Sequence, residues 1–487
     1  MTTLRRSLAF SFLDKYLSQA IMIGTTAIMA RLLTPAETGL YLIAYSVIVF
    51  VETARDFGVG TYIIQKAELD QRALRTAFTL TMLLSAVLAG LLYLGANRLA
   101  GFYGEPAVAT ILKVSTLGLL VVPLGAPLQA LMRRELAFST LAWINIAAAA
   151  CSSLATVCLA VMGVGAESYI WGFVLSNVAA TILALAARRP DPAIYLPSLA
   201  KWREVATFGG TATLVALLNL GYDLLPRLLL GRLWGMDAVG IYARALTICQ
   251  LPDRTIMGAL QPVVLPAMAA RARHGGDLKD AYLRGHALMS AVQWPVLAVL
   301  ALLAMPVVRI LLGEQWLATV PMIQVMAVGM MALAPAFMTY PLLVSAGRIR
   351  DALTSSLIGL PVAAAVVTVA CHLGPQALAA SMLLTAPGYM ALAFWFIARA
   401  IGLRWQDMAR ASWASLATTS GAMLVPCIVV ALSPTGFDLA PATTVVAVLG
   451  AGAGWLAGLF ASGHPFSGEM VRIGRGLLSR VGQGRAA

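Results

Sequence analysis

The sequence predicts an all-α membrane protein with about 14 transmembrane helices, built as two pseudo-symmetric six-helix lobes plus two C-terminal helices. Its 487 residues are 60% hydrophobic and only 11% charged, whereas an average soluble protein is roughly 25% charged. Apolar runs of about 20 residues recur along the chain, and each is long enough to cross a hydrocarbon layer. Most lysines and arginines fall in alternate connections, as the positive-inside rule expects for a polytopic protein.

The elements follow from the apolar runs, which are separated by short polar connections. The expected helices lie at 8–33, 38–61, 75–96, 107–131, 138–162, 167–187, 205–231, 238–269, 285–312, 318–344, 351–372, 375–398, 411–432 and 440–461. With this numbering, Lys and Arg gather in the even-numbered connections and at both termini, so both termini are expected on the cytoplasmic side. The first run contains Asp14 and Lys15, which a cleaved signal peptide would not carry, so it is expected to be a retained helix.

An internal repeat places the lobe boundary. A pattern in the first two helices returns about 201 residues later, and the longest polar linker lies just before it returns. Such a repeat with an even number of helices per copy predicts two lobes of the same orientation. The expected divisions are a lobe at 1–187, a cytoplasmic linker at 188–204, a second lobe at 205–401 and two extra helices with a basic tail at 402–487. The matching segments are Arg31-Leu32 with Gly39-Leu40-Tyr41, against Arg232-Leu233 with Gly240-Ile241-Tyr242.

Ionisable residues within the apolar runs are the candidate functional residues. A charge inside a bilayer costs about 2.5–3.5 kcal/mol on insertion scales, so it usually faces a partner or a wet cavity. These residues concentrate in the first, second, seventh and eighth helices, and Glu52 in one repeat matches Asp253 in the other. We expect them to line one central cavity, although intrahelical ion pairs that fix helix packing remain the alternative for each. They are the basic Lys15, Arg55, Arg227 and Arg254, and the acidic Asp14, Glu52, Asp56, Asp223 and Asp253.

No catalytic constellation, metal site or cofactor motif is recognisable in the sequence. The four histidines are scattered, and the five cysteines lie in apolar segments without metal-ligand spacing, which is typical of packing residues. The net charge of +13 would suggest nucleic acid in a soluble chain. Here the basic residues sit in loops between apolar runs, so no nucleic-acid partner is expected.

One stretch resembles a known family. The segment Ala30-Arg31-Leu32-Leu33-Thr34-Pro35-Ala36-Glu37-Thr38-Gly39-Leu40-Tyr41, followed by Asp56-Phe57-Gly58 and Ile64-Gln65, is similar to the opening of Wzx-type oligosaccharide flippases. Arg133-Arg134-Glu135 and Ala346-Gly347-Arg348 also resemble this polysaccharide-transporter branch of the multidrug/oligosaccharidyl-lipid/polysaccharide exporter superfamily. The resemblance implies two six-helix lobes around a central cavity, alternating access, and a bacterial inner-membrane location.

The resemblance also implies the cargo, a polyprenyl-pyrophosphate-linked oligosaccharide for exopolysaccharide, capsule or O-antigen synthesis. The pyrophosphate would need cations, which Lys15, Arg55, Arg227 and Arg254 would supply. Acidic Glu52 and Asp253 would bind a driving proton or sodium ion, or balance the arginines. Membrane lipid and a polymer-export machinery are the other expected partners.

Two alternatives remain open. A lipid II or multidrug exporter would share the fold with a different cargo, although a cation exporter would need a more acidic cavity. A membrane polysaccharide polymerase or glycosyltransferase would need a sizeable periplasmic loop with catalytic groups, and no such connection is long enough. The sequence therefore favours a transporter rather than an enzyme.

Overall fold

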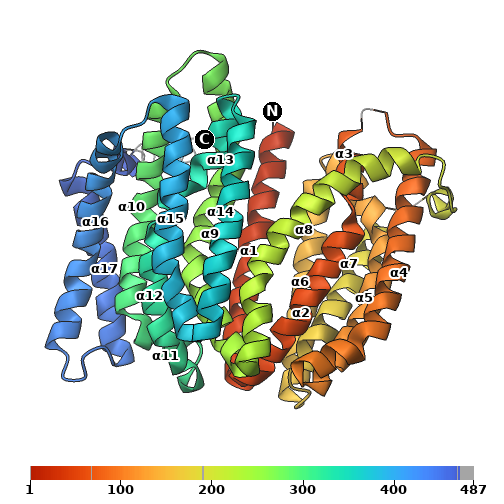
Figure 1. Ribbon diagram of the computed structural model, residues 1–487, viewed down its shortest axis with the longest axis horizontal. Coiled ribbons are helices and arrows are strands. Elements are labelled where there is room, and N and C mark those ends of the chain that lie inside the picture. The colour runs from red at the N-terminus through yellow and green to blue at the C-terminus, as the bar shows by residue number, and fades with distance from the viewer. Residues whose placement is uncertain (1, 67, 189–190, 469, 472–487) are drawn as a thin grey trace, which may run out of the picture. The chain divides into compact units, whose positions relative to one another are not determined.

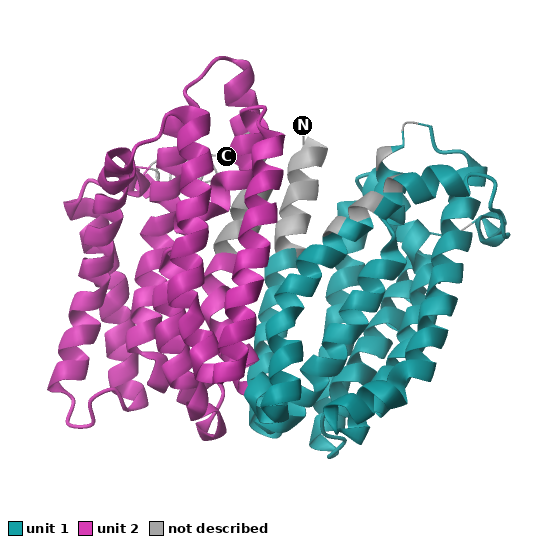
Figure 2. Ribbon diagram, viewed as in Figure 1, with its two compact units in different colours: residues 1–240 teal, residues 241–487 magenta. Residues whose placement is uncertain are grey.

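The computed structural model describes the backbone of residues 2–66, 68–188, 191–468 and 470–471. Within these ranges the side chains of 2–14, 65, 208, 211–212, 215, 255–263 and 265–267 are not described. The described residues form helices and turns and contain no strand. They divide into two compact units, Met1–Gly240 and Ile241–Ala487 (Figure 2). The all-α class predicted from the sequence is confirmed.

Unit 1 is a bundle of long helices joined by short turns (Figure 1). Helix α4 packs along α5, α5 along α7, α6 along α7, α1 on α6, and α2 on α8. Its elements are α1 (Thr2–Leu32), α2 (Pro35–Asp56), α3 (Val59–Gln65), α4 (Gln71–Tyr103), α5 (Pro106–Arg134), α6 (Phe138–Val161), α7 (Glu167–Ala187), the 3-10 turn η1 (Pro192–Tyr195) and α8 (Trp202–Leu233).

Unit 2 follows along the helix α9 (Gly235–Arg273), whose first turns belong to unit 1. Helix α12 packs on α15, α14 on α15, and α10 on both α12 and α16. The two last helices pack on each other and on α10, so they are part of the bundle. The further elements are α10 (Leu278–Leu302), α11 (Ala304–Leu311), η2 (Glu314–Thr319), α12 (Val320–Met331), η3 (Ala334–Met338), α13 (Thr339–Ser345), α14 (Ile349–Leu373), α15 (Pro375–Ile401), α16 (Trp405–Leu432) and α17 (Pro441–Ala461).

The chain is a multi-pass membrane protein. Among the described residues, nine helices are long and apolar enough to cross a bilayer, and ten if the pair Glu314–Met331 and Ala334–Ser345, bent by 51°, counts as one span. The expected spans α1, α2, α8 and α9 are not among these helices, and only their described residues were considered. These are the four helices in which the sequence concentrates ionisable residues. The expected total of fourteen crossings stays a prediction.

Every expected helix range is helical in the described residues, but three expected single helices are broken. The range 38–61 breaks at Phe57 and Gly58, which are left-handed with φ of 39° and 62°. The range 285–312 breaks after Leu302, four residues before Pro306, and 318–344 breaks after Met331, four residues before Pro335. A proline ring clashes with the carbonyl four residues earlier, which explains why both helices end at these positions.

The units do not divide the chain where the repeat does. The repeat puts the boundary at the linker 188–204, whereas the compact units meet at Gly240 and Ile241. Helix α8 lies with unit 1 because it packs on α2, α3 and α4. Compactness and repeat are different properties, so the assignment of 1–187 and 205–401 as lobes stays a prediction.

Candidate functional site

Helix α2 begins at a fully formed capping box. The Thr34 hydroxyl oxygen accepts from the Glu37 backbone N–H at 3.2 Å, and the Thr34 backbone N–H donates to the Glu37 carboxylate at 2.9 Å. Pro35 occupies the first helical position, where its missing N–H costs nothing. The Thr-Pro-x-Glu pattern therefore fixes where α2 starts, and hence which residues its later turns present.

Helix α2 ends where its backbone meets α8. A Cβ atom built on Gly209 of α8 would lie 1.9 Å from the Phe57 carbonyl oxygen, and one built on Gly58 would lie 2.9 Å from the Gly209 Cα. Gly58 also has a positive φ that residues with a side chain rarely adopt. Two glycines on different elements thus permit the bend between α2 and α3 to press against α8.

The last turn before this bend carries the charged triplet predicted from the sequence. Arg55 pairs with Asp56, whose Oδ1 lies 2.6 Å from its Nη2, and its Nη1 lies 3.7 Å from Oε1 of Glu52. The arginine is only 4% exposed, whereas the Asp56 side chain is 68% exposed. The Nη1 group forms no hydrogen bond with any described residue. A buried guanidinium therefore retains donor capacity that no described residue uses.

Helix α8 adds a second cation near Tyr45, which lies earlier in α2. Tyr45 of α2 lies within electrostatic reach of both Glu52 and Arg227, and Arg227 also acts on Asp223 of its own helix. Arg227 is half-buried and Asp223 is exposed. Residues Arg55 and Arg227, predicted from distant parts of the sequence, thus belong to two helices that pack on each other in unit 1.

A group of stacked tyrosines adjoins these charges and was not predicted. The ring centroids of Tyr41 and Tyr45 lie 5.4 Å apart, and those of Tyr41 and Tyr169 of α7 lie 4.4 Å apart, both pairs stacked. The signal was present in the sequence, because Tyr41 and Tyr45 are one helical turn apart and Glu52 follows two turns later. Amphipathic rings beside charges suit a ligand with apolar faces and hydroxyl groups.

The matching acid in unit 2 has a different environment. Asp253 of α9 is 9% exposed and accepts a hydrogen bond of 2.6 Å from Nε2 of Gln293 on α10. The remaining Gln293 oxygen is buried and has no partner among the described residues. Neighbouring Arg254 is exposed and donates to Gln250 of its own helix at 2.9 Å. Glu52 and Asp253 therefore match in sequence, but only Glu52 faces an arginine among the described contacts.

The first helix contains two of the predicted residues, Asp14 and Lys15. Lys15 is exposed on α1. The side chain of Asp14 lies outside the described residues. The structure therefore brings together Glu52, Arg55 and Asp56 on α2, places Arg227 and Asp223 on the neighbouring α8, and places Asp253 beside Gln293 in unit 2.

The repeat has a physical counterpart where α2 meets the start of α9. A Cβ atom on Gly39 would lie 1.9 Å from the Met236 carbonyl oxygen, and one on Gly240 would lie 2.1 Å from the Pro35 carbonyl oxygen. Gly39 and Gly240 are 201 residues apart, and so are Pro35 and Met236. Gly39 thus contacts Met236, and its repeat equivalent Gly240 contacts Pro35, the repeat equivalent of Met236. An isologous two-fold interface requires such a reciprocal pair of contacts. We call these four residues the glycine seam.

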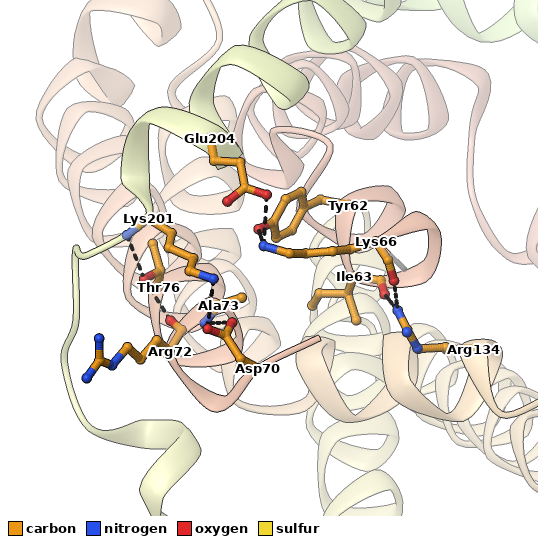
Figure 3. Close-up of polar contacts among 10 residues, drawn as sticks. All are labelled: Tyr62, Ile63, Lys66, Asp70, Arg72, Ala73, Thr76, Arg134, Lys201 and Glu204. Carbon is orange, nitrogen blue, oxygen red and sulfur yellow. Dashed lines mark hydrogen bonds and ion pairs between the residues drawn. The ribbon is translucent and has the colours of Figure 1, made fainter. Parts of the chain in front are cut away.

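At the other end of α8, ionic contacts hold its first turn in place (Figure 3). Lys66 Nζ lies 2.8 Å from the Glu204 carboxylate and 2.7 Å from the Tyr62 hydroxyl, and Lys201 Nζ lies 2.7 Å from the Asp70 carboxylate. Hydrogen bonds from Lys201 and then from a backbone N–H outweigh desolvation and hold the pKa of Asp70 below its usual value. Burial opposes the charge of Lys66, but its bonds to Glu204 and Tyr62 raise its pKa.

Two of the histidines that look scattered in the sequence, His286 and His464, take part in one set of polar contacts in unit 2. His286 of α10 contacts the Ser412 hydroxyl at 3.0 Å, and Ser290 donates to Ser415 at 2.8 Å. Ser415 in turn contacts His464 at 3.1 Å. This chain of polar groups joins α10 to α16 and to the turn after α17. Serine is common in membrane helices for many reasons, so the sequence held no specific signal for it.

Comparisons with known proteins identify the family. The model of the family of polysaccharide biosynthesis proteins matches residues 28–321. The chain is 27% identical to the teichuronic acid biosynthesis protein TuaB of Bacillus subtilis over 63% of this chain and 64% of TuaB. It is 25% identical to the lipopolysaccharide biosynthesis protein WzxC of Escherichia coli over 62% of this chain and 61% of WzxC. The match thus spans less than two thirds of either relative.

Among solved structures, the inward closed conformation of the lipid II flippase MurJ superposes with a TM-score of 0.72 at 12% identity. The match covers 93% of this chain and 98% of that one. At this identity the likeness concerns the fold alone. The expected all-α, polytopic membrane fold is therefore confirmed.

Proposed function

We propose that this chain, which belongs to the family of polysaccharide biosynthesis proteins, is a flippase and not an enzyme. Its cargo would be a polyprenyl-pyrophosphate-linked oligosaccharide, moved from the cytoplasmic to the periplasmic face of the bacterial inner membrane. The observation that carries the proposal is Arg55, a buried arginine whose Nη1 has no hydrogen-bond partner among the described residues, on the helix that the family match includes. The relatives TuaB and WzxC, named for polysaccharide biosynthesis, support it.

In this proposal Arg55 and Arg227 bind the pyrophosphate. A guanidinium donates two parallel hydrogen bonds to phosphate oxygens, which a lysine ammonium cannot do. Glu52 balances Arg55 while the site is empty, since it lies 3.7 Å away and does not use the full donor capacity of the arginine. Tyr41 and Tyr45 would contact the sugar, while the polyprenyl chain stays in lipid.

The carboxylates provide the coupling. Asp253 is buried and bonded to a neutral glutamine rather than to a cation, so binding a proton or a sodium ion would remove an uncompensated charge. We assign the coupling ion to Asp253, with Glu52 as charge balance for Arg55. A polymer-export machinery would then take the cargo on the periplasmic side.

The topology belongs to the same proposal. Fourteen crossings with both termini cytoplasmic place the basic connections after α3, α5 and α7 inside. The lobes 1–187 and 205–401 would rock against each other, and the glycine seam is the part of unit 1 where the repeat-related helices already touch. A drug exporter is less well supported, because the ionisable cluster in unit 1 contains arginines as well as acids.

Depletion of the protein in its host tests the proposal. The lipid-linked oligosaccharide should accumulate on the cytoplasmic face, while its assembly continues and periplasmic polymer falls. Sugar transfer by the purified protein, or normal translocation after depletion, would contradict it.

A further inference from the structure

Two surface pockets occupy equivalent places in the repeat. The first, of about 480 Å³ in unit 1, includes Arg134 and Glu135 after α5 and Arg188 after α7. The second, of about 530 Å³ in unit 2, includes Gly347 and Arg348 after α13 and Arg399 near the end of α15. Helices α5 and α7 are the fourth and sixth expected spans, and α13 and α15 end the tenth and twelfth. The chain thus contains a matched pair of pockets.

The two pockets differ in charge. The first is formally neutral, because Glu135 and Asp191 balance its two arginines, and Arg188 pairs with Glu135. The second has three arginines and one acid, Asp351, which leaves a charge of +2. Asp351 pairs with Arg348 at 3.3 Å. Neither Arg350 nor Arg399 forms an ion pair with any carboxylate in the described part of the chain.

The surroundings of the second pocket are apolar and outward-facing. Ile349, Leu353 and Trp395 are 61%, 60% and 52% exposed, as expected of side chains that contact lipid. Trp395 lies beneath the guanidinium of Arg399, with 5.3 Å between the ring centroid and Cζ. Tryptophan beside a basic residue is typical of the membrane interface. The pocket therefore lies where a lipid-facing surface passes into the polar layer.

A second, separate cavity of about 340 Å³ also involves α14 and α15. It is lined mainly by residues 333–340, together with Ala352, Ser355 and Tyr389. Asp351 of the arginine pocket and Ala352 of this cavity are adjacent in α14. The basic pocket itself adjoins exposed apolar side chains, Ile349, Leu353 and Trp395, which matches a molecule with an anionic head and an apolar body.

We propose that the pocket formed by Arg348, Arg350 and Arg399 binds the phosphate of an anionic phospholipid of the cytoplasmic leaflet. Arg350 and Arg399 donate to the phosphate oxygens, and Arg348 stays paired with Asp351. Arginine forks bind phosphate well, and basic pockets between membrane helices bind lipid headgroups. The site is separate from the charged cluster on α2.

Native mass spectrometry of the full-length protein, titrated with phosphatidylglycerol in neutral detergent, tests this proposal. The wild-type protein should retain phosphatidylglycerol and not phosphatidylcholine. Arg350→Gln/Arg399→Gln should lower the apparent affinity about tenfold or more, because charged hydrogen bonds are lost. Arg350→Lys/Arg399→Lys should retain part of it. Thermal unfolding without added lipid checks folding, and neither substitution breaks an ion pair.

Arg188→Gln, in the neutral pocket, is the matched control and should leave the affinity unchanged. An equal loss in this control would mean a general effect of surface charge and would overturn the proposal. So would unchanged binding by the Arg350/Arg399 variant, displacement of phosphatidylglycerol by millimolar inorganic phosphate, or preferential retention of polyprenyl pyrophosphate at this pocket.

Discussion

At Arg55, one buried guanidinium faces two carboxylates of its own helix, and the two contacts differ in environment. Asp56 is largely exposed, so its pairing is screened by solvent and contributes little. Glu52 is mostly buried, with 22% of its side chain exposed. Removing the arginine would therefore leave the Glu52 carboxylate buried without a cation, which is unfavourable. This asymmetry makes the role of Arg55 testable by a double substitution.

If Arg55 binds pyrophosphate, Arg55→Ala should lower polymer export at least tenfold, because charged hydrogen bonds to the cargo are lost. Glu52→Gln/Arg55→Gln should also fail, although it leaves no unpaired charge on either of these two residues. Arg55→Lys should keep part of the activity. Export is measured at matched membrane abundance, with exposed Arg98→Ala as the control. Full export by the double variant would make Arg55 a packing residue.

Asp70 offers a pH-dependent test of the contacts around the start of α8. Its pKa is lowered in the folded protein, so the stability it contributes is present above its unfolded pKa of about 3.9. That contribution is lost as the pH falls through the lower folded value. The thermal unfolding temperature should therefore drop below about pH 4, and Asp70→Asn should make this drop smaller. An equal drop in both proteins would assign it to other carboxylates.

How far single residues could be predicted depended on whether their partners were local. The pairing of Arg55 with Glu52 and Asp56 follows from helix spacing, and the structure has it. The contact of Asp253 with Gln293 joins residues 40 positions apart, and no sequence period reveals it. The contacts of His286 and His464 with serines of other helices could not be predicted for the same reason, because the partners are far apart in the sequence.

At the scale of elements, backbone chemistry decided where helices stop. Pro306 and Pro335 end the helices four residues before them, and Gly58 allows the left-handed bend after α2. Apolar length alone predicted unbroken spans in these places. Hydropathy predicts whether a segment partitions into a bilayer. A break in the helical hydrogen bonds depends instead on a single proline ring or on a glycine that lacks a Cβ atom.

The glycine seam yields a prediction about symmetry. Gly39→Ala and Gly240→Ala should each destabilise the protein by about 1–3 kcal/mol, because each new methyl group would overlap a carbonyl oxygen. The two losses should be similar, and the double variant should lose less than their sum, because both act on one contact. Thermal unfolding measures this. Gly90→Ala on α4, where a Cβ would meet no atom within 4 Å, is the control.

Strict additivity, or an effect in only one of the two variants, would argue against the reciprocal contact. An equal effect of Gly90→Ala would show that glycine replacement in these helices is harmful in general.

At the scale of the whole molecule, composition and charge alternation were sufficient to predict the polytopic helical fold, because a bilayer imposes length and polarity on every span. They did not predict that α8 would pack with α2 in unit 1, since this pairing depends on glycines 151 residues apart, Gly58 and Gly209.

The flippase assignment is tested most directly by reconstitution. The purified protein is placed in liposomes with a fluorescent polyprenyl-pyrophosphate oligosaccharide, and the fraction protected from an external quencher is followed. We predict that the wild-type protein speeds exchange between leaflets well above protein-free vesicles, that Arg55→Ala abolishes most of the gain, and that a fluorescent phosphatidylcholine is not moved. Exchange at the protein-free rate, or equal movement of the phosphatidylcholine, would contradict the account.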